Sequence, residues 1–187
     1  MKKFIFTILF LMSFIMTFAQ NQKYINSPVT FTEIGFGANI PTDGSDTFGG
    51  VFVELGRYIN PIFSIGINFT YGENTYDDGL GLIGINTHYK LSPYFNLNAP
   101  FDFDLFAGLN YGWLSYYDSY DDWYYYDRYT ISYIVPKVGA NMFVNLDTNH
   151  MFQIGLEPSF SWYISTNQDK SKSVGVFNIL GKVRINF

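Results

Sequence analysis

Apolar and polar residues alternate along most of this chain, and the alternation is clearest in its last segment, VGVFNILGKVRINF. Phe177, Ile179 and Val183 fall on one side of an extended chain, whereas Asn178 and Lys182 fall on the other. A period of two residues is typical of a β-strand with one face in an apolar environment. The segment is therefore predicted to form a half-buried strand.

Seven earlier segments repeat this pattern, so the sequence predicts eight strands. The predicted strands cover residues 30–40, 48–59, 62–71, 80–91, 101–114, 133–145, 151–164 and 174–187. Each is close to or longer than the roughly 9–11 residues with which a tilted strand crosses the hydrocarbon of a membrane. An even number is typical of single-chain barrels whose two ends lie on the same side. The predicted fold is all-β, an eight-stranded antiparallel up-and-down transmembrane β-barrel.

Bulky apolar residues and small residues fall on opposite faces of these strands. Phe36, Ile65 and Leu156 lie on the bulky face, while Gly35 and Gly66 lie on the other face among polar residues. The interior of an eight-stranded barrel is only just wide enough to be filled by side chains, so the bulky face would overpack it. We therefore expect the bulky face to contact lipid. A soluble secreted barrel of the lipocalin type, the weakest alternative, would turn this face inward.

The first 19 residues have the pattern of a secretory signal peptide. Lys2 and Lys3 precede an apolar run, and Thr17 and Ala19 are small residues at the positions that matter for cleavage. The run is shorter than the roughly 20 apolar residues that a membrane-spanning helix needs. We expect cleavage after Ala19, with residues 20–187 forming one barrel domain.

Composition excludes several other classes of protein. Aromatic residues make up 21% of the chain, more than a soluble core of this size could bury. The chain has no cysteine, which excludes disulfides and thiolate metal sites. Its formal net charge of −5 becomes −7 without Lys2 and Lys3, and a negative protein is a poor partner for nucleic acid.

The C-terminal strand, which alternates up to a final phenylalanine, and the signal peptide resemble those of bacterial outer-membrane barrels. The chain is similar to the small OmpA/OmpX/OmpW-like barrels. This resemblance implies Sec-dependent export to the outer membrane, contact with its lipid and lipopolysaccharide, and a monomeric barrel. It also implies that the barrel-assembly machinery recognises Val183, Ile185 and Phe187.

The connectors between the predicted strands alternate in character. Polar connectors cover residues 41–47, 72–79, 115–132 and 165–173, and tighter ones cover residues 60–61, 92–100 and 146–150. The polar connectors together contain ten carboxylates and three basic side chains. Long loops outside and short turns in the periplasm are typical of outer-membrane barrels, so the acidic end is interpreted as the cell exterior.

Nine charged residues fall on the inward face of the predicted strands. They are Glu33, Glu54, Lys90, Asp102, Asp104, Lys137, Glu157, Lys182 and Arg184. Ions held away from water must be paired. Antiparallel register predicts that Glu33 lies beside Glu54, Lys90 beside Asp102 and Lys137 near Glu157, and that barrel closure brings Lys182 and Arg184 to Glu33. We expect a salt-bridged plug in the periplasmic half, either purely structural or crossed by an ion or proton path.

A polar vestibule is predicted above this plug. Its expected lining is Asn39, Asn68, Thr70, Asn86, Asn110, Ser159 and Ser161.

Pro136 and Pro158 fall on the lipid-facing side of neighbouring predicted strands, at similar depth. Each proline removes a donor from the ladder of hydrogen bonds, so a bulge or a local gap is expected. Two bulges that bend the wall are one interpretation. A wall gap that lets small hydrophobic molecules leave sideways is what the similarity to OmpW-like barrels implies.

The connector that begins at Ser115 and ends at Ser132 is rich in tyrosine and aspartate. Its strand-forming residues predict a hairpin above the membrane. Trp123, Tyr124, Tyr125 and Tyr126 offer rigid contact area with polar tips, which suits an extracellular glycan or protein. The alternative is a solvated or lipopolysaccharide-contacting hairpin without a partner. Its aspartates lack the spacing of an EF-hand calcium loop.

The two histidines do not predict a catalytic site. His88 points inward within reach of Asp102 or Asp104, and His150 lies in a short turn. Neither has a serine placed as a triad partner, and two distant histidines without cysteine are a poor metal site. No enzyme activity, cofactor or metal is predicted.

The sequence thus predicts an integral outer-membrane barrel with a structural or surface-interaction role. The alternative is a narrow channel or a conduit for small hydrophobic molecules, because a bore filled by side chains argues against a wide porin.

Overall fold

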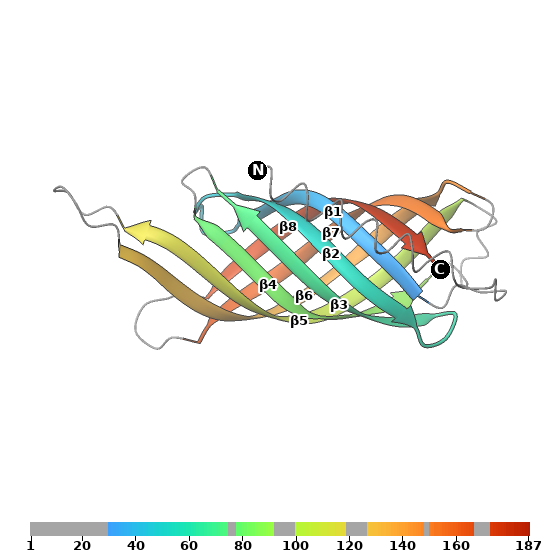
Figure 1. The fold of residues 1–187 in the computed structure, drawn as a ribbon, viewed down its shortest axis with the longest axis horizontal. Helices are drawn as coiled ribbons and strands as arrows, with labels where there is room; N and C mark the ends of the chain where they lie inside the picture. Colours follow the sequence, from blue (N-terminus) through green and yellow to red (C-terminus); the bar gives the residue numbers. More distant parts are fainter. Residues whose placement is uncertain (1–29, 75–77, 92–99, 119–126, 148–149, 167–172) are drawn as a thin grey trace.

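A computed structural model describes residues 30–74, 78–91, 100–118, 127–147, 150–166 and 173–187, which form a closed barrel of eight strands (Figure 1). The strands are β1 (Thr30–Pro41), β2 (Phe48–Tyr58), β3 (Phe63–Glu73), β4 (Gly79–Lys90), β5 (Phe101–Asp118), β6 (Asp127–Asn145), β7 (Phe152–Ser165) and β8 (Val174–Asn186). Each strand pairs antiparallel with its chain neighbours, and β8 closes the barrel on β1. The predicted fold is confirmed. The predicted signal peptide lies outside the described residues.

Two strands extend beyond their predicted ends. β5 runs to Asp118 and β6 begins at Asp127, and the two strands stay paired up to these residues. Tyrosine, threonine and isoleucine dominate this extension, and these residues favour the extended chain. The result is a paired stem that projects past the neighbouring strands (Figure 1). Trp123, Tyr124, Tyr125 and Tyr126 lie outside the described residues.

The bulky apolar face points outward, as the alternation predicted. Phe36, Ile65 and Leu156 are 58%, 40% and 52% exposed, and Ile67 and Leu109 are exposed as well. A soluble barrel of the lipocalin type would turn this face inward. None of the described residues form a helix that is long and apolar enough to cross a membrane.

The inward face holds more than glycines and ions. Phe31, Phe52, Phe106 and Phe143 are almost completely buried in the bore. Gly56 makes room for one of them, because a Cβ at this position would overlap the ring of Phe31. The glycines of the inner face therefore act as sockets for large side chains, a role that the sequence analysis did not anticipate.

Candidate functional site

Charged side chains from five strands meet inside the barrel. Glu33 on β1 receives Lys182 Nζ on one carboxylate oxygen at 2.6 Å and Arg184 Nη2 on the other at 2.6 Å. Arg184 Nη2 also lies 2.6 Å from Asp104 Oδ2 on β5. Strand β8 thus supplies cations to β1 and β5. Because β8 and β5 are not neighbouring strands, the contact between Arg184 and Asp104 crosses the bore.

The network continues on the other side of Lys182. This ammonium also contacts Glu157 on β7, and Glu157 Oε1 lies 2.5 Å from Lys137 Nζ on β6. The pairs join into one sequence, Asp104, Arg184, Glu33, Lys182, Glu157 and Lys137, which we call the ion chain. Acid and base alternate along it and every member is buried. Alternation gives each desolvated charge an opposite neighbour, which such charges require.

Aromatic rings cover the cations of the ion chain. Lys182 Nζ lies 4.2 Å from the centroid of Phe52, and Arg184 Cζ lies 4.1 Å from that of Phe143. Lys137 Nζ lies 5.2 Å from the centroids of both Phe52 and Phe106. These are cation–π distances, at which the negative faces of the rings attract the cations. Phe52 and Phe106 each lie near both Lys137 and Lys182.

Glu54 contacts two side chains that were not predicted as its partners, and one of them is His88, which was expected near Asp102 or Asp104. Glu54 lies opposite Glu33 in the ladder, as expected, but its carboxylate contacts Asn86 Nδ2 and His88 Nε2, each at 2.6 Å. Both residues belong to β4, beyond the neighbouring strand β3. The contact is possible because Gly66 on β3 has no side chain, and a Cβ there would overlap the carboxylate of Glu54.

A separate polar group lies nearer the short turns. Lys90 Nζ lies 3.1 Å from Asp102 Oδ2, and Gln153 Nε2 donates to the same oxygen at 2.6 Å. His150 Nδ1 is 3.8 Å from it. Of these side chains, those of Lys90 and His150 are partly exposed, at 23% and 54%. The structure therefore places all nine predicted interior charges in the bore, but in three sets: the ion chain, Glu54 with its partners on β4, and the pair of Lys90 and Asp102.

The ladder between β6 and β7 is interrupted at both predicted prolines. Pairing stops at Val135 and Pro136, resumes for three residues, and stops again opposite Glu157 and Pro158. Both prolines remain paired on their other sides, with β5 and β8. The two interruptions are staggered along the strands rather than level.

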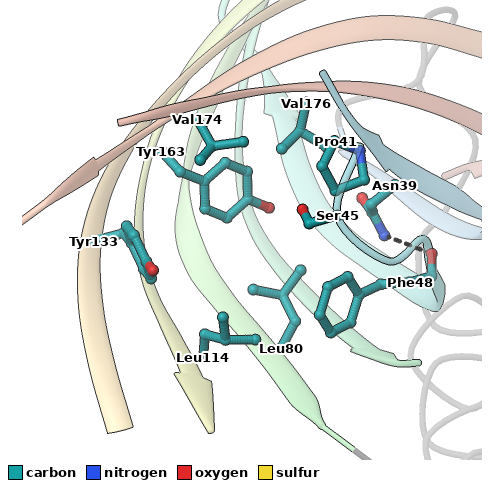
Figure 2. A pocket seen from close by; sticks show the side chains of 10 residues that line it. All are labelled: Asn39, Pro41, Ser45, Phe48, Leu80, Leu114, Tyr133, Tyr163, Val174 and Val176. Atoms are coloured by element: carbon teal, nitrogen blue, oxygen red, sulfur yellow. Dashed lines mark hydrogen bonds between the residues drawn. The ribbon is translucent and has the colours of Figure 1, made fainter. Parts of the chain in front are cut away.

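The loop end of the barrel, where β1 joins β2 and β7 leads toward β8, contains a cavity of about 80 Å³ (Figure 2). We call it the mouth cavity. Its lining is Asn39, Pro41, Ser45, Phe48, Leu80, Leu114, Tyr133, Tyr163, Val174 and Val176. Among the seven residues of the predicted polar vestibule, Asn39 lines this cavity. The other six are buried in the wall of the bore. The cavity was not predicted.

The histidines contact carboxylates and amides. His88 lies 2.6 Å from Glu54 and 3.3 Å from the amide nitrogen of Asn141, and its ring packs against Phe31 and Phe106. No serine hydroxyl is among the hydrogen-bond partners of His88 in the described residues, so no serine–histidine pair of a catalytic triad is seen there. Within the described ranges, no three histidine or carboxylate side chains come together in a way that could hold a metal ion.

The residues predicted as an assembly signal lie at the end of β8. Val183 is 47% exposed, Ile185 is paired with Thr32 of β1, and the backbone N–H of Phe187 donates to the carbonyl of Thr30 at 2.9 Å. Their recognition by assembly machinery stays a prediction.

No protein-family model matches the sequence, and no curated protein is similar to it at the sequence level. Solved structures do share its fold. Neisserial surface protein A (NspA) superposes with a TM-score of 0.64 at 15% identity, over 84% of this chain and 96% of that chain. The N-terminal barrel domain of Pseudomonas aeruginosa OprF gives 0.52 at 13% identity, over 84% and 97%. Ail, the attachment invasion locus protein of Yersinia pestis, gives 0.51 at 12% identity, over 85% and 99%. At such identities the likeness shows the fold, that of small outer-membrane barrels.

Proposed function

We propose that this chain is an integral outer-membrane protein whose bore is closed by the ion chain and whose role is structural or surface-interacting. The observation that carries the closed bore is the unbroken alternation of buried acids and bases from Asp104 to Lys137, with phenylalanine rings against the cations. An ion entering this region would have to displace a paired side chain that has no access to water. Desolvation makes such a step costly, which favours a structural plug over a conducting path.

The outward apolar face supports a membrane location. Exposed isoleucine, leucine and phenylalanine side chains surround the barrel, and such a surface is stable only against hydrocarbon. Export by the Sec route, recognition of Phe187 by the assembly machinery and a monomeric state belong to the same proposal. Cell fractionation after substitution of Phe187 by Asp tests the recognition step, because loss of this aromatic side chain should leave the chain outside the outer-membrane fraction.

Conductance in a planar lipid bilayer tests the plug. We expect the purified barrel to give no discrete ohmic steps, and Arg184→Ala to open small ones because it removes the cation shared by Glu33 and Asp104. If the wild-type protein gives conductance steps and Arg184→Ala enlarges them, the bore holds an ion path and the purely structural plug is wrong. Arg57→Ala, an exposed cation on β2, is the matched control and should change nothing.

The surface-interaction part of the proposal concerns the β5–β6 stem and residues 119–126. Ail has been crystallised with the heparin analogue sucrose octasulfate, which makes a glycan a reasonable partner for a barrel of this fold. The polar connectors of this chain carry ten carboxylates and three basic side chains, so a polyanion would be repelled. A neutral glycan or a protein surface suits the tyrosines and Trp123 better. Deleting residues 116–126 should abolish binding to whole cells or to a neutral glycan array, and unchanged binding would leave the connector without a partner.

A second candidate function is a conduit for small hydrophobic molecules. The interruptions of the β6–β7 ladder at Pro136 and Pro158 favour it, because missing hydrogen bonds are where a barrel wall opens most easily. Replacing both prolines by valine should restore the ladder and slow the uptake of a hydrophobic dye into liposomes. Pro61→Val, in the exposed turn between β2 and β3, is the control. Equal uptake by all three proteins would rule out a route through this wall.

A further inference from the structure

The mouth cavity is separated from the ion chain in character as well as in position. Leu80 and Leu114 line it on β4 and β5, and Val174 and Val176 line it on β8. None of its lining residues is charged. An apolar cavity of this kind does not hold water well, because a buried water molecule needs two to four polar partners. The wall therefore favours an apolar occupant and disfavours an ionised one.

Among the polar side chains of the wall, Tyr163 stands out because its hydroxyl is both buried and, within the described residues, unpaired. Tyr163 is only 6% exposed, and its hydroxyl has no hydrogen-bond partner in the described part of the chain. Figure 2 shows this hydroxyl directed into the cavity, toward the side of Ser45. The ring is held in place by an edge contact with Tyr133, with 5.6 Å between ring centroids. A buried hydroxyl without a partner is unfavourable, and a ligand that offers one hydrogen-bonding group would remove this cost.

The size of the cavity limits what can enter. Its volume of about 80 Å³ is smaller than the roughly 150 Å³ that enclose a benzene molecule. Ser45, on the connector between β1 and β2, is exposed, so the cavity opens toward the loop end and an occupant need not be enclosed completely. A single ring or a short branched chain fits this description.

We propose that the mouth cavity is a binding site for a small neutral molecule, mostly apolar, that carries one hydroxyl or carbonyl group bonded to Tyr163. The inference does not rest on the closed bore, because the cavity lies on the loop side of the ion chain. Conductance tests the plug and ligand titration tests the cavity, so either can fail alone.

The probe is 4-fluorobenzyl alcohol, with 4-fluorotoluene as its counterpart without the hydroxyl. Each is titrated by ¹⁹F NMR into the full-length mature protein in lipid nanodiscs, and empty nanodiscs of the same lipid give the contribution of the bilayer. We expect a saturable component for the alcohol that empty nanodiscs lack. Tyr163→Phe keeps the ring and removes one hydrogen bond. It should therefore weaken the affinity for the alcohol about three- to tenfold and leave the affinity for 4-fluorotoluene unchanged.

Two tryptophan substitutions locate the site. Leu80→Trp should fill the cavity and remove the saturable component for both probes. Leu109→Trp, on the outer face where Leu109 is 59% exposed, should leave both unchanged. Far-UV circular dichroism confirms that each variant is folded before it is titrated.

Three results would overturn the proposal. They are the absence of any saturable component beyond empty nanodiscs, equal affinity of the alcohol for Tyr163→Phe and wild type, and an equal loss in Leu109→Trp and Leu80→Trp. The last result would place binding on the lipid-facing surface.

Discussion

The middle of the bore and its loop end are both lined by inward-facing side chains of the same eight strands, but they are filled in opposite ways. In the middle, Lys182 contacts two carboxylates and the face of a phenylalanine ring, and its side chain is 0% exposed. At the loop end, Leu80, Tyr163 and Val176 surround a cavity, and the hydroxyl of Tyr163 has no hydrogen-bond partner among the described residues. Charged groups must be paired completely once they are buried, whereas apolar groups tolerate an incomplete fit. Rigidity is therefore expected in the middle and ligand binding at the mouth.

The largest expected effect comes from breaking the ion chain. Lys182→Met leaves Glu33 without one of its two cations and Glu157 with Lys137 alone, so it should lower the free energy of unfolding by about 3–5 kcal/mol. Urea unfolding in lipid vesicles, followed by tryptophan fluorescence, measures this loss. Arg57→Met removes an exposed cation of β2 and should cost less than about 0.5 kcal/mol. Equal losses in the two variants would mean that burial does not set the importance of these charges.

A smaller effect is expected from filling a glycine socket. The Cβ of Gly56→Ala would overlap the ring of Phe31, so this variant should be destabilised by about 1–3 kcal/mol in the same assay. Gly181→Ala is the matched control, because its Cβ would meet nothing closer than 3.8 Å. Adding Phe31→Leu to Gly56→Ala should recover part of the loss. A double variant no more stable than Gly56→Ala alone would argue against the socket.

The smallest effect is expected at the turn end. The side chain of Lys90 is 23% exposed, and its partner Asp102 also accepts a hydrogen bond from Gln153. Water screens such a pair, so Lys90→Met should cost at most about 1 kcal/mol. A loss as large as that of Lys182→Met would show that the turn end and the middle of the bore are one cooperative unit.

Much of the fold could be predicted because the alternation of apolar and polar residues in a barrel strand shows which face contacts lipid. Phe36 and Glu33 differ in parity, and only one of them tolerates hydrocarbon, so the alternation predicted which face of each strand points outward. The predicted contacts of Lys137 with Glu157 and of Lys182 with Glu33 also form, since these residues lie on neighbouring strands, but they are diagonal. In the ladder, Lys137 lies opposite Ser161 and Lys182 lies opposite Gly35.

Contacts across the bore could not be predicted in this way. Arg184 reaches Asp104 on a strand that is not its neighbour, and Glu54 passes Gly66 to reach His88. These contacts depend on which side chains are long and which positions are glycines. The register of the ladder gives only the backbone neighbours, so it does not predict them. The mouth cavity was missed for a related reason, because Leu80 and Tyr163 were not weighed as inward-facing residues.

The placement of the cations on the last strand has a consequence for insertion into the membrane. Lys182 and Arg184 of β8 together neutralise carboxylates on β1, β5 and β7. A sheet of seven strands would carry Glu33 and Asp104 into the bilayer with no cation in contact, at a cost of several kcal/mol for each ion. Partly formed barrels should therefore stay at the membrane surface, and arrival of the final strand is the event that allows the sheet to enter.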